Sequence, residues 1–106
     1  MAKYMLKASY TVEGTKGLMK SGGSARRAAV KKTIEGIGGK LECFYYMFGD
    51  ADAFAIVDVP DVVSIAAVSL AINASGGAHV STTVLLTPDE IDAAAKKSVS
   101  YQPPRG

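Results

Sequence analysis

Hydrophobic and polar residues alternate along residues 3–11 and 79–86, and a period of two is typical of half-buried β-strands. In residues 3–11 one side of the extended chain carries Tyr4, Leu6, Ala8 and Tyr10. The other side of the same segment carries Met5, Lys7 and Ser9. The pattern predicts three further strands, at residues 41–48, 53–59 and 79–86.

A helical period follows the first predicted strand. One face of this helix is apolar and carries Val30, Ile34 and Ile37. We expect Ser24 to be its N-cap and the pair Gly38-Gly39 to end it. Four glycines within residues 12–23 leave room for only a short helical piece before it, which we place at residues 15–20.

Two more helices have clear start signals. Asp61 is the expected N-cap of a helix that continues to Ser75, and residues 62–75 contain no charged side chain. A helix that is apolar on nearly every side needs cover on more than one side, and this one is too short to cross a membrane. Residues 87–90, Thr-Pro-Asp-Glu, predict a capping box that begins a last short helix ending near Lys97.

The element order β-α-β-β-α-β plus a terminal helix predicts an α+β, ferredoxin-like domain over residues 3–97, followed by an irregular tail at residues 98–106. Helices cover one face of such a sheet. The other face cannot be mainly polar, because residues 41–48 are apolar on both sides: Leu41, Cys43, Tyr45 and Met47 on one, and Phe44, Tyr46 and Phe48 on the other. We therefore expect a homo-oligomer, a dimer or a multiple of dimers, in which a second sheet covers this face.

Composition narrows the function classes. The chain has 106 residues with a net charge of +2, one cysteine and one histidine, so neither an intrachain disulfide nor a multi-histidine metal site is possible within one subunit. Charge is uneven: residues 1–40 carry nine basic and two acidic groups, whereas residues 41–92 carry eight acidic groups and no basic one. Nucleic-acid binding is not favoured at this net charge, although Arg26, Arg27, Lys31 and Lys32 would be its basis. The first residues contain no long apolar run, so we expect a cytoplasmic protein without membrane association.

Residues 49–61, Gly-Asp-Ala-Asp-Ala-Phe-Ala-Ile-Val-Asp-Val-Pro-Asp, resemble the glycine–tyrosine–aspartate signature of the GYD-domain family, which consists of small bacterial and archaeal proteins. Residues 8–11, 38–42 and 85–90 fit the same family, so the resemblance covers residues 3–97. This chain departs from the signature at Ala51, where the family has tyrosine. The resemblance implies a dimeric α/β barrel. Relatives in that superfamily include cofactor-independent monooxygenases and haem-degrading enzymes, but the family itself has no established activity to carry over.

Four side chains on the predicted strands are candidates for binding a small ligand: Lys7, Tyr10, Tyr45 and His79. A phenol and a lysine could orient an oxygenated aromatic molecule or stabilise an enolate, and the histidine could be a general base or a haem ligand. The alternative is structural: the tyrosines anchor a core or an interface, and the histidine is a hydrogen-bonded loop residue.

An anion could bind where a glycine pair precedes a helix, with Ser24, Arg26 and Arg27 as its candidates, although capping explains the same residues. Asp50 and Asp52 could bind a hard cation, or could simply form a tight turn, and we expect no metal site. Cys43 alternates with apolar neighbours and is most simply a buried thiol.

The sequence favours a non-enzymatic module that binds a small ligand or a protein partner, with no cofactor. The alternative is a cofactor-independent or haem-linked monooxygenase that uses Tyr10, Lys7 and His79. Neither the identity of the ligand or partner, nor the size of the oligomer, follows from the sequence.

Overall fold

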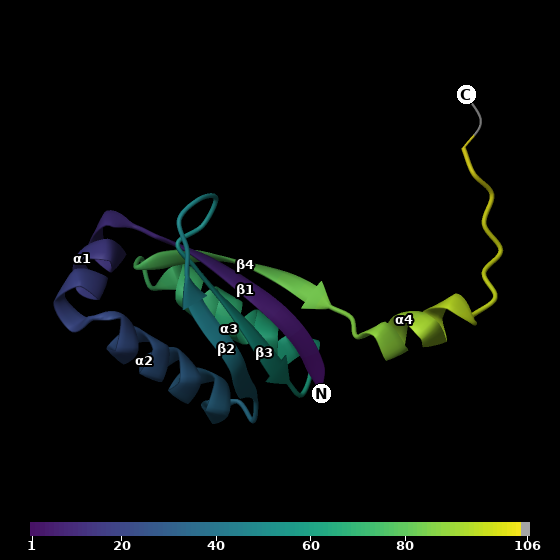
Figure 1. The fold of residues 1–106 in the computed structure, drawn as a ribbon, viewed down its shortest axis with the longest axis horizontal. Helices are drawn as coiled ribbons and strands as arrows, with labels where there is room; N and C mark the ends of the chain where they lie inside the picture. Colours follow the sequence, from purple (N-terminus) through teal and green to yellow (C-terminus); the bar gives the residue numbers. More distant parts are fainter. Residues whose placement is uncertain (105–106) are drawn as a thin grey trace.

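The four strands form one open antiparallel sheet in the order β2-β3-β1-β4 (Figure 1). The computed structural model describes residues 1–104. Strands β1 (Ala2–Tyr10) and β3 (Ala53–Val59) are central, and β2 (Lys40–Tyr46) and β4 (Ala78–Leu85) are the edges. This order is that of the ferredoxin-like fold, so the predicted fold class is confirmed.

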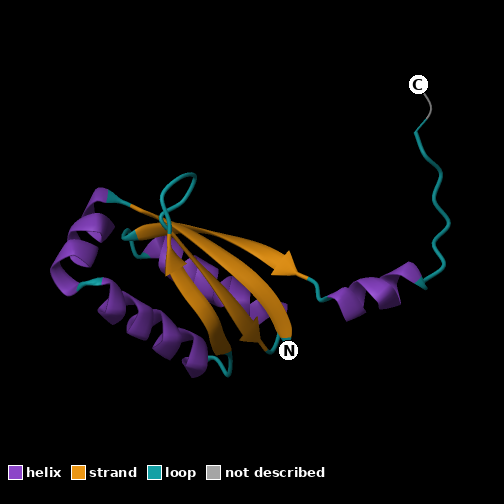
Figure 2. Cartoon of the chain, in the orientation of Figure 1, coloured by secondary structure: helices purple, strands orange, loops and turns teal. Residues whose placement is uncertain are grey.

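Three helices lie on one side of the sheet (Figure 2). They are α1 (Val12–Ser21), α2 (Gly23–Gly36) and α3 (Val62–Ala74). Helix α2 packs against β2, and α3 packs against β3 and β4. The fourth helix, α4 (Pro88–Ala95), extends away from the body of the domain. No helix within residues 1–104 is both long and apolar enough to span a bilayer.

The core lies between the sheet and helices α2 and α3. Alternate residues of β3 are buried, and these are Ala53, Ala55, Val57 and Val59. From α2, Ile34 is fully buried, with Val30 and Ile37 packed beside it, as the helical period predicted. The opposite face of the sheet carries the other half of each alternating set, and no helix within residues 1–104 covers it.

The predicted N-cap of α2 is wrong. Helix α1 extends to Ser21 instead of ending at Lys20, and α2 begins at Gly23, so a single residue joins the two helices. That residue, Gly22, is the N-cap, and its φ of 87° lies in the left-handed region where glycine is favoured. Ser24 is therefore already inside α2, where its side chain makes no capping hydrogen bond.

The two predicted sides of the second strand are also wrong in part, because β2 contains a bulge. Leu41 is opposite Val57 and Cys43 is opposite Ile56, so Glu42 is an extra residue without a partner. Leu41 and Phe44 consequently both pack against the core, although strict alternation put them on opposite sides. The strand also ends at Tyr46, which leaves Met47 and Phe48 in the following loop.

The bulged Glu42 takes part in a small ion network at the edge of the sheet. Lys3 Nζ lies 3.0 Å from Glu42 Oε1 and 2.9 Å from Asp58 Oδ2. The hydrogen bond to Asp58, and to a smaller extent the one to Glu42, raises the pKa of the Lys3 amine above its ordinary value of 10.5. The lysine side chain is therefore held in place on the uncovered face of the sheet.

The N-cap Asp61 and the capping box at Thr87, both predicted from the sequence, are confirmed. Ser64 N donates to Asp61 Oδ1 at 2.7 Å, and Thr87 and Glu90 make the two hydrogen bonds of a capping box. These hydrogen bonds hold the pKa of the Asp61 and Glu90 carboxyls below their ordinary values of 3.8 and 4.5.

Acid should therefore weaken the fold partly through Asp61. A carboxyl whose pKa is lower in the folded than in the unfolded state contributes stability above its unfolded pKa, and this is lost as pH falls through the folded pKa. We expect the melting temperature to fall below about pH 4, and the Asp61→Asn variant, which keeps a capping oxygen but does not titrate, to lose less of it. Thermal unfolding followed by circular dichroism across this range checks the expectation. An equal loss in the Asn variant would contradict it.

Candidate ligand-binding site

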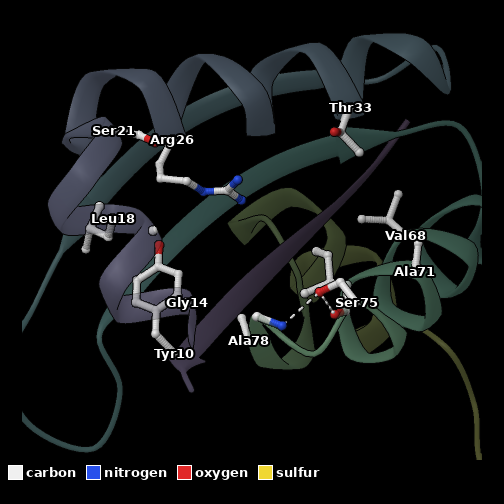
Figure 3. Close-up of a pocket in the computed structure, with 13 residues that line it drawn as sticks. Tyr10, Gly14, Leu18, Ser21, Arg26, Thr33, Val68, Ala71, Ser75 and Ala78 are labelled. Carbon is white, nitrogen blue, oxygen red and sulfur yellow. Dashed lines mark hydrogen bonds between the residues drawn. The ribbon is translucent and has the colours of Figure 1, made fainter. Parts of the chain in front are cut away.

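A cleft of about 400 Å³ lies on the helix side of the sheet, between α1, α2 and α3 (Figure 3). Tyr10 comes from the end of β1, Leu18 from α1, Arg26 from α2 and Ile72 from α3. Small residues make up much of the remaining wall, namely Gly14, Gly17, Ser21, Ala71, Ser75, Gly77 and Ala78. Its volume is within the range of small-molecule sites in proteins.

A smaller apolar hollow of about 60 Å³ continues from the cleft towards the sheet. Tyr10, Arg26, Ile72 and Ala78 line both spaces. The hollow adds apolar side chains from the strands and from α2, and these include Leu6, Ala8, Val30, Phe44 and Val80. A ligand in this place would meet polar groups at Tyr10 and Arg26 and apolar surface beyond them.

Arg26 is the one charged residue that lines the cleft within residues 1–104. Its guanidinium group projects over the cleft, and the Tyr10 hydroxyl points towards the same region (Figure 3). None of the ion pairs formed within the described part of the chain involves Arg26. Five N–H donors on a planar group are thus available to an anion.

Tyr46 fixes the first turn of α2, from which Arg26 projects. Its hydroxyl donates to Gly23 O at 3.0 Å, and its ring packs edge-on against Phe44 with 5.2 Å between centroids. Burial, and then the neighbouring Tyr10, raise the pKa of the Tyr46 hydroxyl, whereas Arg26 lowers it. Tyr46 was not among the predicted site residues, because the apolar pattern on both sides of its strand does not show which side faces the helices.

The contact of α1 with the loop after α3 forms one end of the cleft. Thr11 is the N-cap of α1, and its amide and hydroxyl donate to Gly77 O and Gly76 O at 3.1 and 2.8 Å. Gly14 lies so close to this loop that a Cβ built on it would be 1.8 Å from Gly77 O. This contact explains why α1 is longer than the glycines of residues 12–23 suggested.

The remaining ligand candidates lie on the other side of the sheet. Lys7 and His79 line a shallow hollow of about 270 Å³, and Lys7 Nζ is 2.6 Å from Asp50 Oδ2. This hydrogen bond lowers the pKa of the Asp50 carboxyl. Tyr45 is also on this side and stacks on Phe54, with ring centroids 5.7 Å apart. The structure therefore brings Lys7 and His79 together, and separates both from Tyr10.

The acidic turn has partners within the protein. Asp50 is paired with Lys7, and Asp52 Oδ2 accepts a hydrogen bond from Tyr10 N at 2.8 Å. Ala51, at the position of the signature tyrosine, is only 4% exposed. Of the three predicted anion-binding residues, Arg26 reaches the cleft, while Ser24 and Arg27 are exposed residues of α2 that do not line it. Cys43 is half-buried on β2.

Comparison with known proteins gives one result. A family model described as GYD domain matches residues 4–95. No curated protein and no solved structure matches the chain.

Proposed function

The chain belongs to the GYD domain family, and from this premise we propose that it is a homo-oligomeric protein that binds a small anionic molecule in the cleft between its helices and its sheet. The observation that carries the proposal is Arg26, which projects over a cleft that has no other charged lining residue within residues 1–104. An anion bound there would meet no acidic side chain.

The cleft and hollow together suggest the class of ligand. A guanidinium group binds a carboxylate through two parallel hydrogen bonds, and the Tyr10 hydroxyl can add a third. The apolar hollow beyond Tyr10 and Arg26 favours a flat, weakly polar body. An aromatic carboxylate has both parts, so we take this class as the ligand type.

Titration of the protein with benzoate, followed by two-dimensional NMR, tests the proposal. We expect saturable shifts at the amides of Gly14, Gly17 and Gly77, and at least about 10-fold weaker binding in Arg26→Gln, because a charge-assisted hydrogen bond is lost. Benzamide, which has the same ring without the charge, should bind weakly.

The matched control is the neighbouring variant Arg27→Gln, which removes the same charge from the same helix outside the cleft. It should bind benzoate as the unmodified protein does. Equal loss in both variants would mean that benzoate responds to general positive charge, and no saturable shift at millimolar benzoate would remove the aromatic carboxylate as the ligand type.

The oligomer part of the proposal is supported by the uncovered face of the sheet. Its middle is apolar: Met5, Ile56 and Cys43 lie in one row across neighbouring strands, and the stacked pair of Tyr45 and Phe54 forms the next. The Lys3–Asp58 ion pair borders these rows at one end. Lys7, which is paired with Asp50, lies beside Phe54 and continues the second row towards β4. An apolar centre with a polar rim is the usual anatomy of a protein interface, so we propose that a second copy packs its sheet against this face.

A monooxygenase built from Tyr10, Lys7 and His79 has less support. Tyr10 lines the cleft on the helix side, whereas Lys7 and His79 line a hollow on the opposite side of the sheet. One substrate cannot reach all three side chains within one subunit, so binding is favoured over this form of catalysis.

A further inference from the structure

Helix α4 and residues 96–104 form an arm that the rest of the described chain does not bury. No residue of α4 is buried, and Ile91 is 51% exposed. The arm extends away from the domain in both ribbon views (Figures 1 and 2). The radius of gyration is 16.8 Å, whereas a compact chain of this length has about 13 Å.

The direction of the arm is determined by its local sequence. The capping box ties Thr87 to Glu90, with Thr87 N donating to Glu90 Oε1 at 2.9 Å and Glu90 N donating to Thr87 Oγ1 at 3.1 Å. Pro88 restricts the preceding residue to extended conformations, and Thr87 has φ −74° and ψ 159°. Both features fix the start of α4 and the conformation of the residue before it.

The same chain has an apolar groove that nothing in the described residues covers. A hollow of about 400 Å³ lies between α3 and the edge strand β4, and it is lined by Tyr4, Val62, Ile65, Ala66, Ser69, Thr82 and Val84. None of these residues is charged. Val62 and Val84 are 63% and 59% exposed, which is unusual for apolar side chains that face each other across a groove.

The arm has a surface that complements this groove. In helical spacing, Pro88, Ile91 and Ala95 form an apolar side of α4, and Asp89, Asp92 and Lys96 occupy another side. The Ile91 side of the arm and the groove are thus two uncharged, apolar surfaces of one chain.

We propose that the arm of one copy lies in the α3–β4 groove of a second copy, and that the second copy returns the same contact. Such a reciprocal exchange is closed and two-fold symmetric, and each copy covers the exposed apolar side chains of the other. The occupant of the groove is therefore α4 of a second copy, bound through its Ile91 side. This contact uses different residues from the sheet-face interface, and it does not depend on the cleft.

Disulfide trapping in the full chain tests the exchange. In a Cys43→Ser background, one variant carries Ile91→Cys on the arm and a second carries Ala66→Cys at the groove. When the two are mixed under oxidising conditions, we expect a disulfide-linked heterodimer, because a disulfide requires Cα atoms within about 7 Å of each other. The control replaces Ile91→Cys by Asp92→Cys, on another side of the same helix, and should cross-link at least about 10-fold more slowly.

Each outcome decides the matter. Preferential heterodimer formation by Ile91→Cys supports the exchange, and equal rates for the two arm positions overturn it. In the double variant with both cysteines in one chain, a cross-linked dimer supports the exchange, whereas an intrachain disulfide shows that the arm folds back and overturns it. The cross-link between the arm and the groove is also measured with Ile56→Lys added, because this change disrupts the proposed sheet-face interface. A cross-link that still forms in this variant shows that the arm exchange does not depend on the sheet-face interface.

Discussion

Replacing Gly14 by alanine is expected to destabilise the protein by about 3 kcal/mol, because the added methyl group has no space to occupy. A Cβ at this position would lie 1.8 Å from Gly77 O and 2.8 Å from Gly77 C. Both are backbone atoms, so no side-chain rotation can relieve the overlap. Either α1 or the loop after α3 has to move, and the hydrogen bonds of Thr11 to that loop would be strained or lost.

The same change three residues later should have the opposite sign. Gly17 lies in the same helix, and a Cβ built on it meets no heavy atom within 4 Å. Alanine there removes the conformational freedom of glycine from the unfolded chain, so Gly17→Ala should stabilise the protein by about 0.5–1 kcal/mol. Urea unfolding followed by circular dichroism measures both variants. Two variants of equal sign would contradict the close contact of α1 with the loop.

This pair of variants also bears on the cleft, since Gly14 and Gly17 both line it. Gly14→Ala moves one end of the cleft, and it should therefore weaken benzoate binding even at temperatures where the variant is folded. The stability of α1 and the shape of the candidate site thus depend on the same contact.

Much of the fold could be predicted because its signals are local. The alternation in β1 and β4, the Asp61 cap and the capping box at Thr87 each depend on residues a few positions apart. Alternation also assigned Lys7 and Tyr10 to opposite sides of β1 correctly, although both were then treated as parts of one possible site.

The parts that could not be predicted depend on contacts between distant segments. The bulge at Glu42 arises from the pairing of β2 with β3. The side chain that forms an ion pair with Glu42, Lys3, is 39 residues away in the sequence. The early start of α2 follows from the one-residue connection at Gly22, and the length of α1 follows from its contact with Gly77. Tyr10, Arg26 and Tyr46 likewise lie close together only because the fold places β1, α2 and β2 side by side, and no short sequence motif indicates this.

The strand β1 links the two proposed surfaces. Tyr10 faces the cleft, and Met5 and Lys7 face the uncovered side, so one strand contributes to ligand binding and to assembly. Asp52 accepts a hydrogen bond from the amide of Tyr10, while Asp50 in the same turn holds Lys7 on the other side. The two proposed surfaces therefore share β1 and the turn that carries Asp50 and Asp52.

The Ile56→Lys variant is expected to disrupt assembly through the sheet face, because it places a charge in the middle of the apolar rows. Ile56 is opposite Met5 on β1 and Cys43 on β2. A lysine there is tolerated in one subunit, where solvent reaches the side chain, but burial against a second sheet without a partner charge should weaken the association on the order of 1,000-fold.

Since arm exchange would be a separate interface, the measurement is made in an Ile91→Asp background that blocks it. Size-exclusion chromatography with light scattering and native mass spectrometry should then give dimers, and monomers once Ile56→Lys is added. Met19→Lys, which adds the same charge at an 81% exposed position of α1, should leave the dimer intact. A monomer before the addition of Ile56→Lys, or an equal response to both lysine variants, would contradict a sheet-face interface, because only that interface makes the position of the new charge matter.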